Sequence, residues 1–165
     1  MSFASSTAQR VTTLDLDDQR SATKQMMHDY LDHFRFAAER LQNAVRAPEQ
    51  AFDLADWRPV SLQDHLKSYD LAVRDGYDQL SDDFRALFED VAHLLDTKGT
   101  GALVAIRRQQ RRPMMDLLDF ADLCTKTGQT MMECLRRAEL VLHPMRAVPR
   151  NQRPQLEVIS NVLMG

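Results

Sequence analysis

Apolar side chains recur every three or four residues through three long segments, and this spacing limits the fold more than any other feature. A period near 3.5 places them on one stripe of an α-helix, which has to pack against a similar stripe. The first helix is expected over residues 17–46, starting at Asp17 or Asp18 and ending before Pro48. Its stripe consists of Met27, Leu31, Phe34, Ala38, Leu41 and Val45, broadened by Tyr30, Ala37 and Ala44.

The second stripe runs through residues 62–94 without losing its phase. Ser61 is a suitable N-cap before it, and Gly99 is a suitable residue just past its end. Ser81 can also begin a new helix, but the continuous phase favours one long helix, kinked near residues 76–81 and ending at 97–99. The stripe consists of Leu62, Leu66, Tyr69, Val73, Tyr77, Leu80, Phe84, Leu87, Val91 and Leu94.

The third stripe follows Pro113, a residue that suits the first turn of a helix. It passes through Gly128 in unbroken phase, which predicts that the helix continues there and that the glycine lets a neighbouring backbone approach closely. Pro144 is expected to end this helix. The stripe consists of Met114, Leu117, Ala121, Cys124, Gly128, Met131, Leu135, Ala138, Leu142 and Met145.

Three helices of about 30 residues, each about 45 Å long, predict an all-α fold. We expect an elongated antiparallel bundle of three long helices in an up-down-up arrangement, with one or two short helices. Residues 47–60 are expected to form a loop that places Phe52, Leu54 and Trp57 against the bundle. Residues 100–112 are expected to add a short helix.

The length of 165 residues fits one domain. We expect a disordered segment over 1–16, the bundle over 17–146, and a proline-containing tail with a short apolar segment over 147–165. The two cysteines, ten positions apart, are too distant on one helix for a disulfide, and reduced thiols suit a cytoplasmic protein. No apolar stretch approaches the roughly 20 residues of a membrane span. The Ser/Thr-rich start lacks the pattern of a cleaved signal and leaves an uncleaved export signal as an alternative.

Four arginines fall within six positions: Arg107, Arg108, Arg111 and Arg112. On a helix they form one cationic face, which can bind phosphate, carboxylate or an acidic helix. Residues 61–100 carry a formal charge of −5 and residues 101–165 a charge of +4. The preferred interpretation is therefore that the arginine segment is a solvent-exposed connector between helices and that its arginines pair with the acidic residues of 61–100. A protein-binding surface and a nucleic-acid-binding surface are the alternatives. The lack of interleaved aromatic residues counts against single-stranded nucleic acid.

No catalytic or metal-binding motif is found in the sequence, so we expect no cofactor, no metal and no enzymatic activity. His28 and His33 are five positions apart and do not share a helical face. The segment around His65 resembles the H-x-x-K-G arrangement of histidine phosphotransfer domains only in part, since Lys67 comes one position early and the glycine is missing. A phosphotransfer bundle is therefore the last of the alternatives.

Three methionine pairs each place one side chain in a stripe and one beside it. Flexible thioethers fill cores and also suit adaptable binding surfaces, so Met115 and Met132 are candidate contact residues together with the four arginines. Long helices with narrow stripes offer surfaces rather than a pocket. We therefore expect a non-enzymatic, bacterial-type cytoplasmic adaptor, regulator or chaperone that binds a protein partner, or itself, along a helical face. The alternative is a nucleic-acid-binding regulator that uses Arg107–Arg112.

Overall fold

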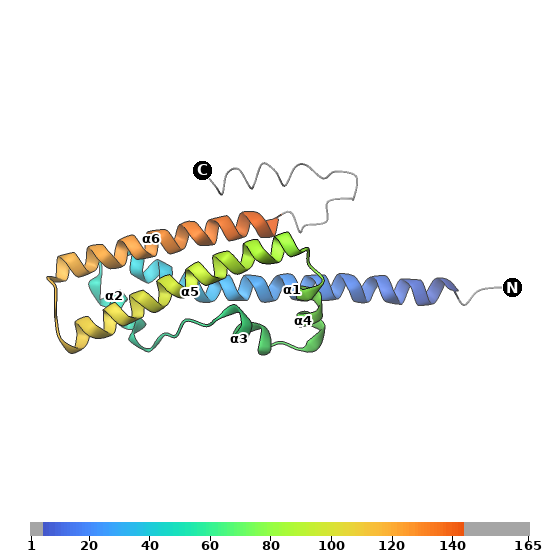
Figure 1. The fold of residues 1–165 in the computed structure, drawn as a ribbon, viewed down its shortest axis with the longest axis horizontal. Helices are drawn as coiled ribbons and strands as arrows, with labels where there is room; N and C mark the ends of the chain where they lie inside the picture. The colour runs from blue at the N-terminus through green and yellow to red at the C-terminus, as the bar shows by residue number, and fades with distance from the viewer. Residues whose placement is uncertain (1–4, 144–165) are drawn as a thin grey trace.

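The computed structural model describes the backbone of residues 5–143 and the side chains of residues 16–143. Every regular element in this range is helical, which confirms the prediction of an all-α fold (Figure 1). The elements are α1 (Ser5–Gln42), α2 (Pro48–Phe52), the 3-10 helix η1 (Asp53–Asp56), α3 (Leu62–Lys67), α4 (Leu71–Asp78), α5 (Asp82–Arg111) and α6 (Leu117–Leu142). The predicted helix end at Pro144, the stripe residue Met145 and the tail over 147–165 lie outside the described residues.

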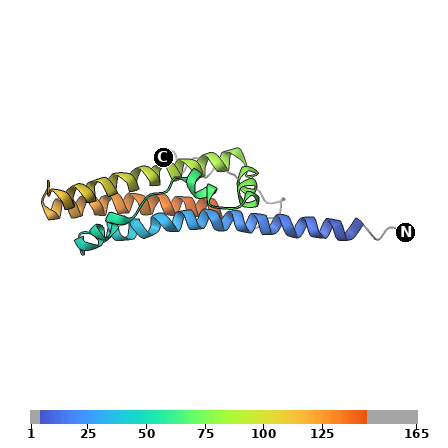
Figure 2. The ribbon, with the colours of Figure 1, turned by 90° about the horizontal axis from the view of Figure 1, so that it is seen from below.

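The three long helices α1, α5 and α6 lie side by side along the long axis (Figures 1 and 2). α6 runs antiparallel to the other two, but α1 and α5 run in the same direction. The predicted up-down-up order is therefore wrong for the first two long helices. The reason is the path of residues 43–81, which return along the bundle through α2, η1, α3 and α4 before α5 begins.

The single helix predicted over 62–99 is wrong, because the chain forms three helices there. The predicted N-cap Ser61 is confirmed, since its side chain accepts a hydrogen bond from the Asp64 amide at 3.2 Å. Asp70 starts α4 and Ser81 starts α5 in the same way. Backbone amides in the first turn of a helix have no hydrogen-bond partner within the helix, and each cap side chain accepts a hydrogen bond from one of them. A new helix can therefore begin at each of these residues.

α5 also buries a different stripe from the one predicted. Gly99 lies inside α5 and does not end it, and residues 100–111 continue the same helix. Because a new helix begins after Ser81, its buried face does not continue the spacing of the preceding apolar residues. The core-facing positions lie one residue after the predicted Leu87, Val91 and Leu94. The buried residues are Phe88, Ala92, Leu95, Gly99, Ala102, Leu103, Ile106 and Gln109.

α1 and α6 form the most extensive helix pair of the bundle. The prediction that α6 continues through Gly128 is confirmed, and a Cβ at this position would lie 2.4 Å from the Gln42 nitrogen and 2.8 Å from the Ala38 oxygen. The predicted stripe of α1 is buried as far as Leu41, whereas Val45 is exposed beyond the end of the helix. α1 begins at Ser5, upstream of the expected start at residue 17, and its first part extends past the rest of the bundle (Figure 2).

The segment expected to be a loop over 47–60 forms two short helices, α2 and η1, on the side of the bundle. Leu54 is buried, and Trp57 is partly buried and packs against the core. The Phe52 ring stacks on the Phe120 ring of α6, with centroids 5.2 Å apart. These contacts fix the segment next to the end of the bundle where α5 leads into α6.

Candidate functional site

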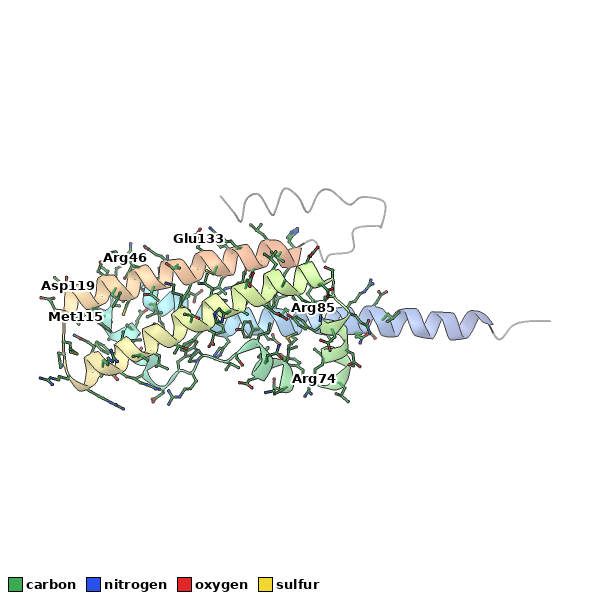
Figure 3. All side chains as sticks on the ribbon, viewed as in Figure 1. Arg46, Arg74, Arg85, Met115, Asp119 and Glu133 are labelled. Atoms are coloured by element: carbon green, nitrogen blue, oxygen red, sulfur yellow. The ribbon has the colours of Figure 1, made fainter. Side chains whose placement is uncertain are left out.

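The connection between α5 and α6 forms one end of the bundle and is exposed along its whole length. All residues from 110 to 119 are exposed. Four of them carry large apolar side chains, and Met114 and Leu118 are the most open, at 77% and 73% exposure. We define the tip as the exposed arginines and apolar residues of this region: Arg108, Arg111, Arg112, Met114, Met115, Leu117 and Leu118. Figure 3 shows Met115 at this end of the molecule.

The local sequence explains why the chain turns here. Arg112 has an extended backbone, as expected for a residue that precedes a proline, and Pro113 has no amide to continue α5. The Asp116 side chain accepts a hydrogen bond from the Leu118 amide at 2.7 Å and starts α6. The result is a short connection whose apolar side chains cannot reach the core.

Gln109 holds this connection in place. It is a buried polar residue on the core face of α5. Its Nε2 donates to the Met115 carbonyl at 2.8 Å, and its Oε1 accepts from the Met114 amide at 3.2 Å. Gln109 is not among the residues predicted from the sequence. Its spacing from Ala102 and Ile106, which places it on the same helical face, is the sequence feature that could have identified it as buried.

The four predicted arginines have two different roles in the structure. The Arg107 guanidinium donates two hydrogen bonds to the Ala55 carbonyl, at 3.1 and 3.0 Å, and so ties α5 to η1. Arg108, Arg111 and Arg112 are exposed, and none of them makes an ion pair within the described residues. The expected pairing with the acidic middle segment is therefore not seen, because α5 places that segment at the other end of the bundle (Figure 3).

Two of the three methionine pairs differ from the expected arrangement of one side chain in the stripe and one beside it, whereas Met131, fully buried, and Met132, partly buried, follow it. Met26 and Met27 are both fully buried, and Met114 is more exposed than Met115. Met132 is partly buried against the core. It lies about 20 Å further along α6 than the tip, so the structure does not bring it together with Met115.

Two of the histidines singled out in the sequence, His33 and His65, are engaged in packing. His65 is partly buried between the rings of Tyr30 and Tyr69, and its Nε2 donates to the Met26 carbonyl at 3.0 Å. His33 stacks on Trp57, and its Nε2 hydrogen-bonds the Arg58 carbonyl at 2.7 Å. A phosphotransfer histidine needs an accessible ring nitrogen, so these contacts disfavour that reading. Residues 16–143 hold no group of three side chains suited to a metal ion.

The two cysteines are buried, and an open hollow lies on one side of the bundle. Burial raises the pKa of Cys124 to about 11 and also raises the pKa of Cys134, so both thiols stay protonated at neutral pH. One open hollow of about 300 Å³ lies where α1 meets α2 and η1. It is lined by the polar side chains of Glu39, Arg40, Asn43, Gln50 and Asp53.

No protein-family model, curated protein or solved structure matches this chain. Among the helices of residues 5–143, none combines the length and the apolar character that a membrane crossing requires.

Proposed function

We propose that this protein is a non-enzymatic adaptor, regulator or chaperone that binds a protein partner through the tip. The observation that carries the proposal is the exposed cluster of Met114, Met115, Leu117 and Leu118, held in place by Gln109. Exposed apolar clusters of this kind mark interaction sites, and methionine and arginine are both enriched in protein interfaces. The rod formed by α1, α5 and α6 presents the cluster at its end.

A protein partner fits the composition of the tip better than a nucleic acid does. Nucleic-acid surfaces are polar and cationic, because their main contacts are to phosphates. The tip instead combines exposed apolar side chains with three exposed arginines, and the exposed carboxylates of Asp116 and Asp119 lie among and just after its apolar residues in the sequence. An interface with an apolar core and a charged rim is typical of protein–protein recognition. We place this function in the cytoplasm, since the chain carries two unpaired thiols.

The test is site-specific photo-cross-linking in the cells that make the protein. A photoreactive amino acid replaces Leu118 at the tip or, as a control, Gln129 on the exposed face of α6. We expect a discrete protein adduct from position 118 and none from position 129, and we expect R108E with R111E to abolish it. Equal adducts from both positions would refute the proposal, and an adduct with nucleic acid would support the alternative.

A further inference from the structure

The end of the bundle opposite the tip is a corner where α4 packs closely against α1. The Gln19 Nε2 donates to the Ala72 carbonyl at 2.8 Å, and the Thr23 hydroxyl lies 3.3 Å from the Val73 carbonyl. Gly76 permits this approach, since a Cβ there would lie 2.2 Å from the Thr23 Oγ1. The contact brings the start of α4 next to the part of α1 around residue 16.

This corner combines exposed apolar side chains with carboxylates. Leu71 at the start of α4 is 71% exposed, and Leu16 on α1 is 46% exposed. Asp75 and Asp78 lie on the same face of α4 as Leu71, four and seven positions later. We define the acidic corner as Leu16, Asp17, Leu71, Asp75 and Asp78, all of them exposed.

The negative charge of the acidic corner is only slightly neutralised within the chain. Residues 70–90 carry seven carboxylates and two arginines. The Arg74 guanidinium is used by backbone carbonyls at the end of α3, and Arg85 is shared between Asp78 and Asp82. Asp17 and Asp75 make no ion pair within the described residues.

The first part of α1 extends past α4, and no other helix of residues 5–143 lies beside it in either ribbon view (Figures 1 and 2). A short helical segment that packs against nothing is marginally stable in water, so a neighbour on its side would stabilise it. That side adjoins the start of α4, because the Gln19 side chain, three residues after Leu16, bonds to the Ala72 carbonyl.

We infer that the tip of one copy docks into the acidic corner of a second copy, beside the extended part of its α1. This inference rests on the proposed function and names a partner for the tip. The three free arginines of the tip face carboxylates in the corner, and the exposed methionines and leucines of the tip cover Leu16 and Leu71. Both surfaces combine charge with apolar area. The tip keeps a net charge of +1 when Asp116 and Asp119 are counted against its three arginines, whereas the corner is negative.

The geometry makes this contact head-to-tail. α5 is 30 residues long, so the tip and the acidic corner of one copy lie about 45 Å apart and cannot meet each other. When the tip of one copy binds the corner of another, the resulting dimer still has one unoccupied tip and one unoccupied corner, to which further copies can bind. The assembly therefore grows with concentration, and its charge-dependent part weakens as salt screens the contact.

Sedimentation of the full chain with paired charge reversals tests the inference. At about 50 mM salt the average mass is expected to rise above 19.0 kDa with concentration, and at about 0.5 M salt to return towards it. The tip variant R108E with R111E and the corner variant D17R with D75R should each weaken assembly at least about tenfold. The matched control, E49R with D90R, makes the same charge change at exposed sites outside the corner and should assemble normally.

Mixing the two variants gives the sharpest result, because each retains one intact surface. The mixture should regain assembly that grows with concentration, because the intact tip of one variant meets the intact corner of the other and the reversed tip meets the reversed corner. A chain carrying all four substitutions should regain assembly for the same reason. A wild-type chain that stays at 19.0 kDa at low salt, or variants that assemble unchanged, would overturn the inference. If position 118 cross-linked to a different protein, the inferred self-association would fail but the proposed function would still stand. If position 118 cross-linked to no protein, the self-association and the proposed function would both fail.

Discussion

Gly128 is the position where the packing of the bundle leaves least room for added volume. The substitution Gly128→Ala places a methyl group 2.4 Å from the Gln42 nitrogen, 2.8 Å from the Ala38 oxygen and 2.9 Å from the Gln42 Cα. All three atoms belong to the backbone of α1, so no side-chain rotation relieves the contact. α1 and α6 have to separate by about 1 Å to reach ordinary van der Waals distances.

The cost of this separation follows from the packing between the two helices. Overpacking a filled core costs about 1–3 kcal/mol, and a gap of that size removes a quarter to a half of the dispersion energy of each contact it opens. Alanine regains about 1 kcal/mol of helix propensity relative to glycine. Because the clash is with backbone at three points, we expect a net loss of about 2 kcal/mol in the free energy of unfolding.

Gly101→Ala is the matched control. A Cβ at Gly101 meets no atom within 4 Å, and the residue is exposed inside α5. The same substitution should therefore stabilise the protein there by about 0.5–1 kcal/mol, through helix propensity alone. Urea unfolding followed by far-ultraviolet circular dichroism measures both changes. The reasoning is refuted if Gly128→Ala is neutral or stabilising, or if the two variants shift the midpoint in the same direction.

Three further predictions concern the tip, the alkaline stability and a helix cap. Gln109→Ala leaves the amides that it holds without their partner, so we expect a loss of about 1–3 kcal/mol and faster hydrogen exchange at Met115. Burial and the hydrogen bond to Asp29 raise the pKa of Tyr69 to about 12, so stability that is present below pH 10 is lost as the pH rises to 12. The stability difference between wild type and Tyr69→Phe, measured by urea unfolding, should therefore shrink over that range; a constant difference would contradict the assignment. Ser81→Ala removes the cap of α5 and should cost about 1 kcal/mol in the same assay, whereas no change would show that the cap is not needed.

The parts of the fold that depend on local pattern could be predicted from the sequence. The stripes from Met27 to Leu41 and from Ala121 to Leu142 are buried, because long helices repeat the same spacing over many turns. For the same reason the break before Asp70 was not predicted, and one continuous helix was preferred to a new start at Ser81. α3, α4 and α5 all face one core, so their apolar residues keep helical spacing across the turns between them.

The direction of α1 relative to α5 could not be read from the sequence, since it depends on the path of residues 43–81 through space. The tip was predicted in part. The arginines and Met115 were identified, but Met114 and Leu117 were assigned to the core because they extend the stripe of α6. Asp116 starts that helix at the end of the bundle, where no other helix within residues 5–143 covers Met114 and Leu117.

Oxidation of methionines in intact cells, read by mass spectrometry, tests most directly whether the tip is a contact surface. The chain carries its own references, because Met26 and Met131 are fully buried whereas Met114 is 77% exposed. In the purified monomer, Met114 and Met115 should oxidise much faster than the buried methionines. If the tip is bound in the cell, Met114 and Met115 should be protected there, and R108E with R111E should restore their oxidation. Equal oxidation of Met114 in cells and in the purified monomer would contradict the account.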